Sequence, residues 1–560
     1  MKEIKNISRT RAQVSSAAVE RMYITMRHLF NRGFYKPMGV SGDTLREALL
    51  ELRPEIYGTI AEEKVELNGL LYVIERLPIG IEECRYINLT SDEGYSFSHF
   101  KAIVPPKRRR NCYRIDEEQM NIEITRGRSD IYDVLTHLTF IFIESHKIKN
   151  RVVLDEEGKV TRDWKKIAAA AVKKEFLELE EKEIIMSHLS NVLGRSFAEV
   201  LDIYEKFAIP ENPDRFLDVI YWLGKLAIEE DIDNNKRTIT FSPLLRERLG
   251  HHIYGEIWSD RIKKVLESKG LLERPIHIIS ANMHSVMNSI FAPYVAKSHL
   301  STTNELEIYE ELSKPENKEL RDLVKEKAER EGMIFLEDES GTNIDVQIFD
   351  TAKINFKQTN FSKAKIEGEF PVIIVMDYAF GEQAYETIDE LLKPYKKSTL
   401  LMNVESVSVM GKAGILVGGK GDIMIPFAHI NEGTGDNYPF DNELTVEMFK
   451  NDDIPVFGGT MVTVLGTSLQ NKDLLKFFHD STWGVIGLEM EGAHYQKAIQ
   501  SASKIRKSIN PDVKVRYAYY ASDNPLETGS TLASGGLGTT GVKPTYLITI
   551  KILEQIFNSK

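Results

Sequence analysis

Cysteine is almost absent from this sequence, since 560 residues include only Cys84 and Cys112. Neither belongs to a CxxC pair or lies beside a histidine at the spacing of metal ligands. The sequence therefore predicts neither a disulfide framework nor a zinc site, and we expect no cofactor. Such a composition is typical of a reducing compartment, and we expect a cytoplasmic protein.

Long hydrophobic runs are also missing. The longest apolar stretch, LTHLTFIFI at 135–143, is far shorter than the roughly 20 residues that a membrane helix needs. The N-terminal residues MKEIKNISRTRAQ lack the apolar core of a signal peptide. We therefore expect no membrane partner.

An excess of positive charge is the third absence. Lysine and arginine number 72 against 84 aspartates and glutamates, which gives a formal net charge of −12. A chain of this charge has no global electrostatic attraction for nucleic acid or an anionic membrane. We expect a small-molecule ligand instead, and any anionic group on it must be held by a local site.

Helical periodicity dominates the chain up to about residue 271. The stretch 163–193, for example, repeats apolar residues at three- and four-residue steps and stops before a glycine. Strand-like pieces, LLYVIERL at 70–77 and MNIEITRG at 120–127, interrupt this pattern. We therefore predict a mainly α-helical domain over 1–271.

From residue 272 the pattern changes to short, continuous apolar runs followed by helix-like text. The runs lie at 276–280, 371–376, 398–410, 421–426, 484–490 and 515–522. This alternation predicts an α/β domain with a buried sheet over 272–560. The charged, helical stretch 301–332 is interpreted as a solvent-facing insertion in that domain.

Polar and glycine-rich residues follow most of these predicted strands. They are SANMHS (280–285), DYAFGEQA (377–384), GKAG (411–414), EMEG (489–492) and SDNP (522–525). Because ligands of such sheets bind beyond the carboxyl ends of the strands, we expect these residues to converge on one pocket.

Two of these stretches carry a family resemblance. GVIGLEMEGA at 484–493, followed by ASDNP at 521–525 and a C-terminal helix, resembles the nucleoside phosphorylase and nucleosidase superfamily, whose members cleave the N-glycosidic bond of nucleosides. MGKAGIL at 410–416 and GDIMIP at 421–426 are similar to the family's glycine turn and the strand after it. The resemblance covers about 272–560 and implies a phosphorylase-like three-layer domain with a central mixed sheet. It also implies a homo-oligomer.

The leaving base needs an acid, because cleavage builds negative charge on it. Asp523, between Ser522 and Asn524 at a strand end, is the candidate general acid for a purine, provided that burial keeps it protonated. A serine and an aspartate at such a position are also typical of a turn or a cap.

The sugar becomes positively charged in the same step, and nearby carboxylates stabilise that charge. By resemblance, Glu491 accepts hydrogen bonds from the ribose hydroxyls, Met490 packs on the sugar face, and Glu489 orients neighbouring groups. In an extended chain both glutamates lie on one face. The alternative for this pair is an ordinary acidic helix start.

The attacking group is either water or phosphate. Phosphorylases of the family hold phosphate with arginines after the first strand and before the glycine turn, and the corresponding stretches here contain none. This departure favours hydrolysis over phosphorolysis. Gly411, Lys412 and Gly414 are candidate ligands for a phosphate, either the nucleophile or one on the substrate, and the overall layout resembles that of AMP nucleosidases.

His284 and Glu382 are the two candidate general bases. The plainer interpretations are a partly buried structural histidine and a helix-start acid. The Gly-, Thr- and Ser-rich stretch 527–544 is a candidate lid, with Lys543 at its end reaching Asp523 or a phosphate, although it also fits an exposed loop.

The N-terminal half offers two basic stretches, PPKRRRNC at 105–112 and TRGRSD at 125–130. Regulation by a nucleotide or phosphate bound there is a hypothesis. The alternatives are an exposed loop for the first stretch and helix capping by Ser129 or Asp130 for the second. For the whole chain, the alternative to an enzyme is a non-catalytic sensor of nucleosides or nucleotides.

Overall fold

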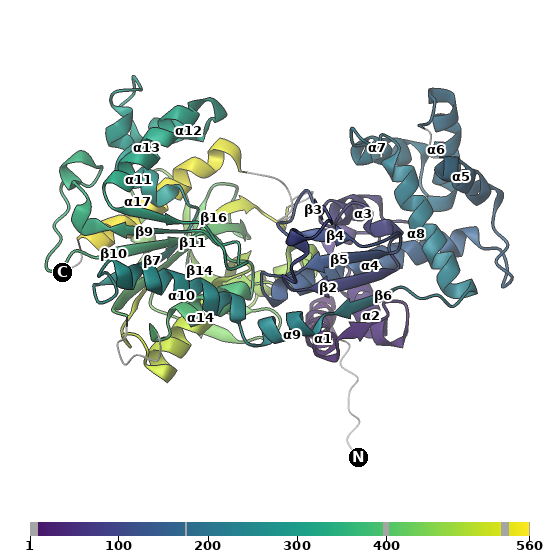
Figure 1. Ribbon diagram of the computed structural model, residues 1–560, viewed down its shortest axis with the longest axis horizontal. Coiled ribbons are helices and arrows are strands. Elements are labelled where there is room, and N and C mark those ends of the chain that lie inside the picture. The colour runs from purple at the N-terminus through teal and green to yellow at the C-terminus, as the bar shows by residue number, and fades with distance from the viewer. Residues whose placement is uncertain (1–8, 174–175, 396–401, 528–536, 559–560) are drawn as a thin grey trace, which may run out of the picture. The chain divides into compact units, whose positions relative to one another are not determined.

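The computed structural model describes residues 9–173, 176–395, 402–527 and 537–558 (Figure 1). The chain forms two compact units. The first unit comprises Met1–Thr125, Asp130–His251 and Ser468–Leu474, and the second comprises Arg126–Ser129, His252–Thr467 and Leu475–Lys560. The second unit thus begins its main segment about twenty residues before the expected position, residue 272, because the helix ahead of the first predicted strand belongs to it.

The first unit contains a mixed six-stranded sheet in the order β1-β6-β2-β5-β4-β3. Its strands are β1 (Phe34–Tyr35), β2 (Tyr86–Thr90), β3 (Ala102–Ile103), β4 (Cys112–Arg114), β5 (Gln119–Glu123) and β6 (Thr238–Phe241). β2 runs parallel to β5 and β6, and the other pairs are antiparallel. This half of the chain is therefore mixed α/β, and the prediction of a mainly helical domain missed its sheet.

Helices supply the rest of the first unit. They are α1 (Arg11–Arg32), α2 (Asp43–Leu52), α3 (Leu67–Ile74), α4 (Arg128–Val152), which starts in the second unit, α5 (Arg162–Lys173), α6 (Leu179–Leu193), α7 (Phe197–Phe207), α8 (Arg215–Ile232) and α9 (Pro243–Gly250). The stretch 70–77, expected to be strand-like, lies mostly in α3, whereas 120–127 contains most of β5 as expected. The helical pattern of 163–193 contains α5 and α6.

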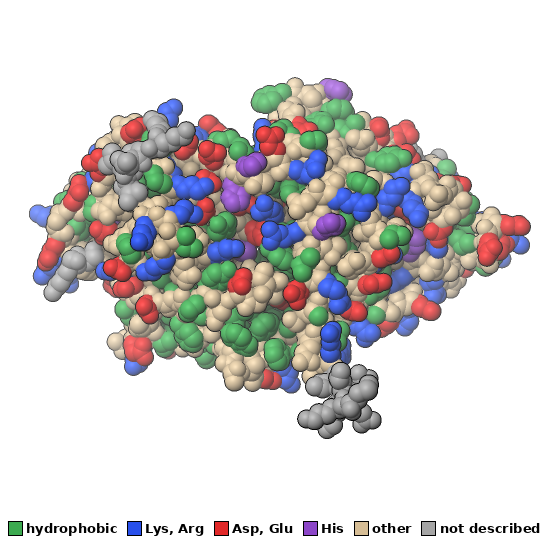
Figure 2. Space-filling model, turned by 90° about the horizontal axis from the view of Figure 1, so that it is seen from below, with side chains coloured by type: hydrophobic (Ala, Val, Ile, Leu, Met, Phe, Trp, Pro, Cys, Tyr) green, Lys and Arg blue, Asp and Glu red, His purple; other side chains and the backbone are tan. Residues whose placement is uncertain are grey.

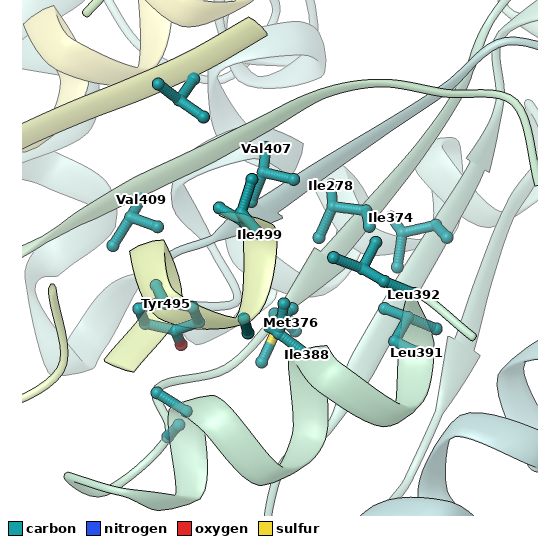
Figure 3. Close-up of a cluster of buried hydrophobic side chains, with 14 of the residues drawn as sticks. Ile278, Ile374, Met376, Ile388, Leu391, Leu392, Val407, Val409, Tyr495 and Ile499 are labelled. Carbon is teal, nitrogen blue, oxygen red and sulfur yellow. The ribbon is translucent and has the colours of Figure 1, made fainter. Parts of the chain in front are cut away.

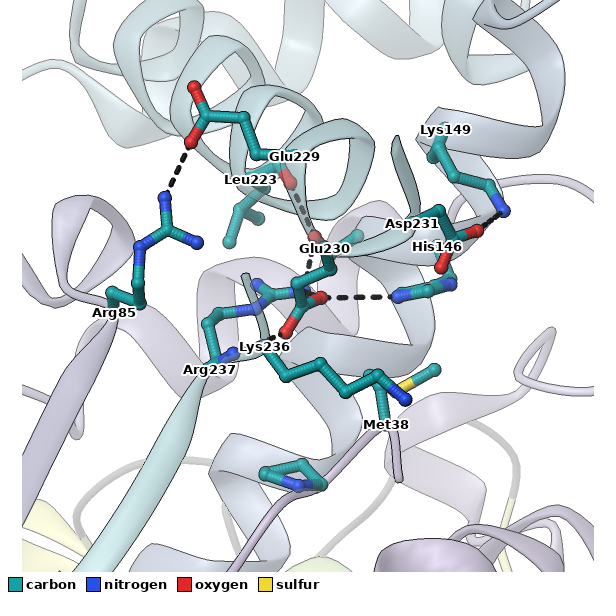
Figure 4. Close-up of polar contacts among 12 residues, drawn as sticks. Met38, Arg85, His146, Lys149, Leu223, Glu229, Glu230, Asp231, Lys236 and Arg237 are labelled. Carbon is teal, nitrogen blue, oxygen red and sulfur yellow. Dashed lines mark hydrogen bonds and ion pairs between the residues drawn. The ribbon is translucent and has the colours of Figure 1, made fainter. Parts of the chain in front are cut away.

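A buried ion-pair cluster joins α4, α8 and Arg237, the residue before β6, in the first unit (Figure 4). Glu230 Oε2 accepts a hydrogen bond from Arg237 Nη2 at 2.6 Å and contacts His146 Nε2 at 3.2 Å. Burial alone would raise the pKa of Glu230, but these partners lower it to about 2. The cluster therefore keeps a carboxylate ionised inside the unit.

The second unit is built on a ten-stranded mixed sheet in the order β13-β12-β14-β15-β11-β7-β10-β9-β8, with β16 pairing to β11 and β12. The strands are β7 (Ile276–Ser280), β8 (Met333–Leu336), β9 (Val346–Asp350), β10 (Val372–Met376), β11 (Val404–Ile415), β12 (Ile423–Asn431), β13 (Asn437–Pro439), β14 (Val456–Thr463), β15 (Val485–Glu489) and β16 (Lys514–Asp523). Four neighbouring strands, β10, β7, β11 and β16, run parallel to one another. Their carboxyl ends therefore lie on the same side of the sheet.

Two layers of helices cover this sheet (Figure 1). The helices of the unit are α10 (Ile253–Ser268), α11 (Ser285–Ala296), α12 (Glu305–Ser313), α13 (Lys318–Arg330), α14 (Gln383–Leu391), α15 (Lys472–Asp480), which starts in the first unit, α16 (Gly492–Gln500) and α17 (Val542–Phe557). Helices α10, α14 and α16 share one buried cluster with the sheet, and α11, α12, α13 and α17 share another. The second unit is therefore a three-layer α/β structure.

The buried strands explain the continuous apolar runs in the sequence. Figure 3 shows Ile278, Ile374 and Val407 of three adjacent strands facing Ile388 of α14 and Ile499 of α16. Alternate residues of the same strands, such as Ile279 and Val375, belong to the cluster on the other face. Since both faces are covered, consecutive positions of these strands can be apolar rather than every second one, as β10 (Val372–Met376) shows.

Acidic and basic side chains are interspersed over the face shown in Figure 2. Among the helices that the structure describes, none is long and apolar enough to cross a bilayer.

Candidate functional site

Gly414 brings two of the predicted site stretches together. This residue of β11 pairs with Leu488 of β15 on one side and with Asp523 of β16 on the other. Neighbouring strands lie about 4.8 Å apart, so Leu488 and Asp523 are separated by about 10 Å. Glu489 follows Leu488 directly, so the start of the acidic stretch 489–492 lies two strands from Asp523, although β15 runs antiparallel to β11 and β16 runs parallel to it.

The stretch GKAG is not a turn, contrary to the prediction. Gly411, Lys412 and Ala413 continue the parallel ladder of β11 with β16, and the register shifts only between Ala413 and Gly414. The extended backbone points successive N–H groups to opposite sides of the strand, so the segment lacks the convergent N–H groups of a turn. Any anion at this position is left to the side chain of Lys412, which is exposed.

Asp523 is buried and has one oxygen available. The Ser522 hydroxyl donates to Asp523 Oδ1, whereas Asp523 Oδ2 has no hydrogen-bond partner among the described residues. Burial raises the pKa of this carboxyl, against the opposing effects of Ser522 and the positive charge of Lys412. An aspartate in this state is suited to hold a proton and to donate it from Oδ2.

Asn524, the next residue, has a structural role in the described residues. Its Nδ2 donates to the Gly418 carbonyl at 3.0 Å, and its Oδ1 accepts from the Leu526 N–H at 3.0 Å. Both ends of the amide are therefore used to shape the turn after β16.

Glu489 caps the helix that follows it. Its Oε2 accepts from the N–H of Glu491 at 2.6 Å and from the N–H of Gly492, and its Oε1 accepts from the Thr463 hydroxyl. Burial and the neighbouring Glu491 raise the pKa of Glu489 to about 8. These bonds match the helix-start alternative for Glu489, and they fix the position of the next two residues.

Glu491 points to a different loop. Its Oε1 accepts a hydrogen bond of 2.9 Å from the N–H of Gly381, in the connection between β10 and α14. Burial raises the pKa of Glu491 to about 7, and the positive charge of Arg126 opposes this rise. Met490, between the two glutamates, is half-buried and packs against the apolar cluster that includes Leu488.

A cavity of about 530 Å³ opens on the α11, α12 and α17 side of the sheet. His284 and Lys412, which the sequence analysis singled out, both line it, together with Asn288, Arg321, Tyr520 and Tyr546. Its volume lies within the range of small-molecule sites. Lys412 connects the cavity to Asp523, because its charge acts on that carboxyl.

His284 and Asn288 give the cavity neutral polar groups. Partial desolvation by the surrounding protein lowers the pKa of the His284 imidazole below its ordinary value. The negative charge of Asp377 opposes this shift. The imidazole is therefore mainly neutral at pH 7. The buried Asn288 donates to the Tyr546 hydroxyl at 2.9 Å, while its Oδ1 has no hydrogen-bond partner within the described chain.

The stretch 301–332 contributes to this cavity, which the sequence analysis did not foresee. Tyr309 of α12 stacks on Tyr546 with ring centroids 3.7 Å apart, and Arg321 of α13 donates to the Leu312 carbonyl at 2.9 Å. Both residues line the cavity. The buried Ile308, Tyr309 and Leu312, spaced as on one helix face, are the signal in the sequence that this segment packs against the domain.

Glu382 and Lys543 occupy different places from the groups described so far. Glu382 is the residue before α14, and its N–H donates to Ser129 Oγ at 2.8 Å. Lys543 Nζ donates to the Asp453 carbonyl at 2.6 Å, and the structure does not bring it to Asp523. Residues 528–536 of the candidate lid lie outside the described part of the chain.

The basic run at 107–110 is folded into ion pairs of the first unit. Arg108 binds Asp133 through two hydrogen bonds of 2.8 and 2.7 Å, and Arg110 pairs with Asp130 at 2.6 Å and with Asp133 at 2.7 Å. Lys107 pairs with Glu75 at 2.7 Å. Arg108 and Arg110 are therefore engaged in ion pairs of the unit, whereas Lys107 and Arg109 are exposed in a loop, as the alternative interpretation expected.

The described residues contain no candidate metal site. No group of three or more His, Cys, Asp and Glu side chains that could hold a metal ion occurs among them.

Comparison with solved structures finds nucleosidases. A 5′-methylthioadenosine/S-adenosylhomocysteine nucleosidase from Campylobacter jejuni is 10% identical, with a TM-score of 0.31, over 50% of this chain and 98% of that one. A futalosine hydrolase mutant of Helicobacter pylori is 11% identical, with a TM-score of 0.31, over 50% and 99%. A nucleosidase of the first kind from Colwellia psychrerythraea, in complex with adenine, is 12% identical, with a TM-score of 0.29, over 51% and 95%.

No curated protein matches the chain. A family model does match, over residues 43–302 and 306–558, and its description is "Family of unknown function (DUF6909)". Since these two ranges cover most of both units, the chain belongs to the DUF6909 family.

Proposed function

We propose that the second unit hydrolyses the N-glycosidic bond of a purine nucleoside or nucleotide. The observation that carries this proposal is the state of Asp523, whose buried carboxyl has one oxygen bonded to Ser522 and the other without a partner among the described residues. It sits across Gly414 from the acidic stretch that starts at Glu489. An acid for the base and a carboxylate for the sugar are the two groups that this reaction needs.

The leaving base is assisted by Asp523. Its Oδ2–H donates to N7 of the purine as the C–N bond lengthens, so that the base departs without a full negative charge. The raised pKa of Asp523 increases the fraction of molecules that carry this proton near neutral pH. Ser522 holds the other oxygen and so fixes the direction in which the proton is offered.

The sugar is held by Glu491 and Met490. Glu491 accepts hydrogen bonds from the vicinal ribose hydroxyls and its charge stabilises the oxocarbenium-like sugar in the transition state. The half-buried Met490 packs on the sugar face. Glu489 acts through Glu491, because it holds the N–H groups of Glu491 and Gly492.

Water attacks the sugar from the side of the cavity. His284, which is mainly neutral, accepts the proton of this water. Lys412 binds an anionic group in the same cavity, and the substrate that supplies such a group covalently is a 5′-nucleotide such as AMP. We therefore propose that the reaction resembles that of an AMP nucleosidase. We also propose that the protein is a homo-oligomer and that the N-terminal unit is regulatory.

The experiment incubates the protein with AMP, adenosine, inosine, guanosine and methylthioadenosine, each with and without inorganic phosphate, and measures free base by chromatography. We expect base release without phosphate. Release only in the presence of phosphate contradicts hydrolysis and supports a phosphorylase. Binding of a nucleoside or nucleotide without any release contradicts the enzyme and supports a sensor.

A further inference from the structure

Four residues from the N-terminal half of the sequence belong to the second unit. Arg126–Ser129 is part of it, whereas Thr125 and Asp130 on either side belong to the first unit. Gly127 makes the contact close: its φ is +78°, and a Cβ added to it would lie 3.3 Å from Gln383 Cα and 3.2 Å from Glu386 Oε2. The segment therefore lies directly against the first turn of α14.

Ser129 holds the turn that precedes α14. It is buried, and its Oγ accepts the N–H of Glu382 at 2.8 Å. The adjacent N–H, that of Gly381, donates to Glu491 Oε1 at 2.9 Å. Two consecutive backbone amides therefore link Ser129 on one side to the proposed ribose carboxylate on the other.

Gly381 is shaped for this arrangement. Its φ is +56°, and a Cβ at this position would lie 2.3 Å from Ser129 Oγ. A residue with a side chain would be strained in this conformation and would collide with the serine. The turn thus depends on Ser129 lying where it does.

Arg126 adds a positive charge to the same turn. Its guanidinium carbon lies 4.8 Å from the ring centroid of Phe380, the residue before Gly381. At this distance a cation is attracted to the face of the ring. The charge also acts on Glu491, where it favours the ionised carboxylate.

We propose that Arg126 and Ser129 are positioning residues of the ribose site: Ser129 fixes the turn 380–382 that holds Glu491, and Arg126 packs on Phe380 of the same turn. This inference rests on the proposed function. It assigns a part in the site to the segment Arg126–Ser129 of the second unit. The ligand that these two residues affect is the vicinal diol of a ribonucleoside or ribonucleotide.

The test uses the full chain with Ser129→Ala, Arg126→Met and Arg126→Lys, and measures kcat and KM for the nucleotide or nucleoside that the wild type cleaves best. We expect Ser129→Ala to lower kcat/KM about 10–100-fold, the order that a displacement of about 1 Å costs a catalytic site. The matched control is Ser196→Ala, which also removes a hydroxyl that accepts a backbone N–H, at the start of α7 in the first unit. Its kcat/KM should equal that of the wild type.

The pH profile separates positioning from a merely structural role. The positive charge of Arg126 lowers the pKa of Glu491, whereas burial raises it. In Arg126→Met the charge is lost, so the pKa of Glu491 rises and a higher pH is needed to ionise it. We expect the acidic limb of kcat/KM to move up by about one pH unit, the low end of the effect of a nearby opposite charge. Arg126→Lys, which keeps the charge, should restore the wild-type profile.

The outcomes are distinct. An active wild type whose kcat/KM and pH profile are unchanged by Ser129→Ala and Arg126→Met overturns this inference and leaves the proposed function standing. A wild type that releases no base from any of the substrates above overturns the proposed function, and this inference with it. If Ser129→Ala does not fold, the two Arg126 variants decide, because a flat response of the acidic limb contradicts the inference by itself.

Discussion

The backbone N–H of Gly381 donates to Glu491 Oε1 over 2.9 Å, which joins the loop after β10 to the loop after β15. These loops are more than a hundred residues apart in the sequence, and the hydrogen bond orients a carboxylate that no helix or strand of its own would fix. Burial raises the pKa of this carboxyl to about 7, so its charge changes near neutral pH.

Lys412→Met tests whether the cavity accepts the phosphate of a nucleotide. Removal of the ammonium should weaken AMP binding about 10–100-fold, which is what one hydrogen bond to a charged group contributes, and should leave the KM for adenosine nearly unchanged. Any effect of the lost charge on Asp523 should change kcat for both substrates alike. Steady-state kinetics with both substrates measure the difference. The control is Lys450→Met, an exposed lysine after β13, for which the two substrates should behave as in the wild type. Equal changes in KM for AMP and adenosine would contradict a role for Lys412 at the phosphate.

Glu386→Gln tests the effect of a buried carboxyl on stability. Burial raises the pKa of Glu386 to about 8, against the charge of Arg128. The folded protein therefore retains a proton that the unfolded chain releases above pH about 4.3, so stability is lost as pH rises from there to 8. The glutamine cannot ionise, and thermal unfolding should show the variant gaining on the wild type between pH 5 and pH 8. For the control Glu326→Gln, at an exposed position, the difference in unfolding temperature from the wild type should be the same at pH 5 and pH 8.

Glu230→Gln tests the ion-pair cluster of the first unit. A partner removed from a buried pair leaves Arg237 unpaired, which costs about 3–5 kcal/mol of stability at pH 7. Because the pKa of Glu230 is lowered to about 2, its contribution is present above about pH 4.3 and lost as pH falls towards 2, so the difference from the wild type should shrink in acid. Denaturant unfolding at pH 7 and pH 3 measures this.

The neighbouring Asp231→Asn is the control for that experiment. Asp231 pairs with Lys149 but its side chain is 46% exposed. A solvent-exposed pair contributes about 0–1 kcal/mol, so the loss should be small at both pH values. Similar losses for the two variants would contradict the special role of the buried cluster.

The strands of the second unit could be predicted from the sequence because they are buried on both faces. Continuous apolar runs at 276–280, 371–376 and 484–490 correspond to β7, β10 and β15. The strands of the first unit have two to five residues each, and their pairings join distant segments, such as β2 with β6. Such short strands give little local pattern, and only β5 was indicated by the strand-like stretch 120–127.

Other parts of the site depended on long-range pairing. GKAG has the composition of a turn, but pairing with β16 keeps it extended, and nothing within those four residues indicates the partner strand. The role of Ser129 was equally hidden: a serine at the start of a helix suggests a cap, and only the fold shows that its hydroxyl accepts the N–H of Glu382. The stacking of Tyr309 on Tyr546 is a third case, because the two residues come from the insertion and from the last helix.

The central claim is that Asp523 donates the proton to a departing purine. The most direct measurement is the rate of free base release by the wild type and by Asp523→Asn, which has nearly the same shape but no acidic proton, with Asp512→Asn at an exposed position as the control. We predict a loss of about 10²–10⁴-fold for Asp523→Asn, the usual contribution of a general acid, and at most a small loss for the control. Base release by Asp523→Asn at the wild-type rate would contradict the account.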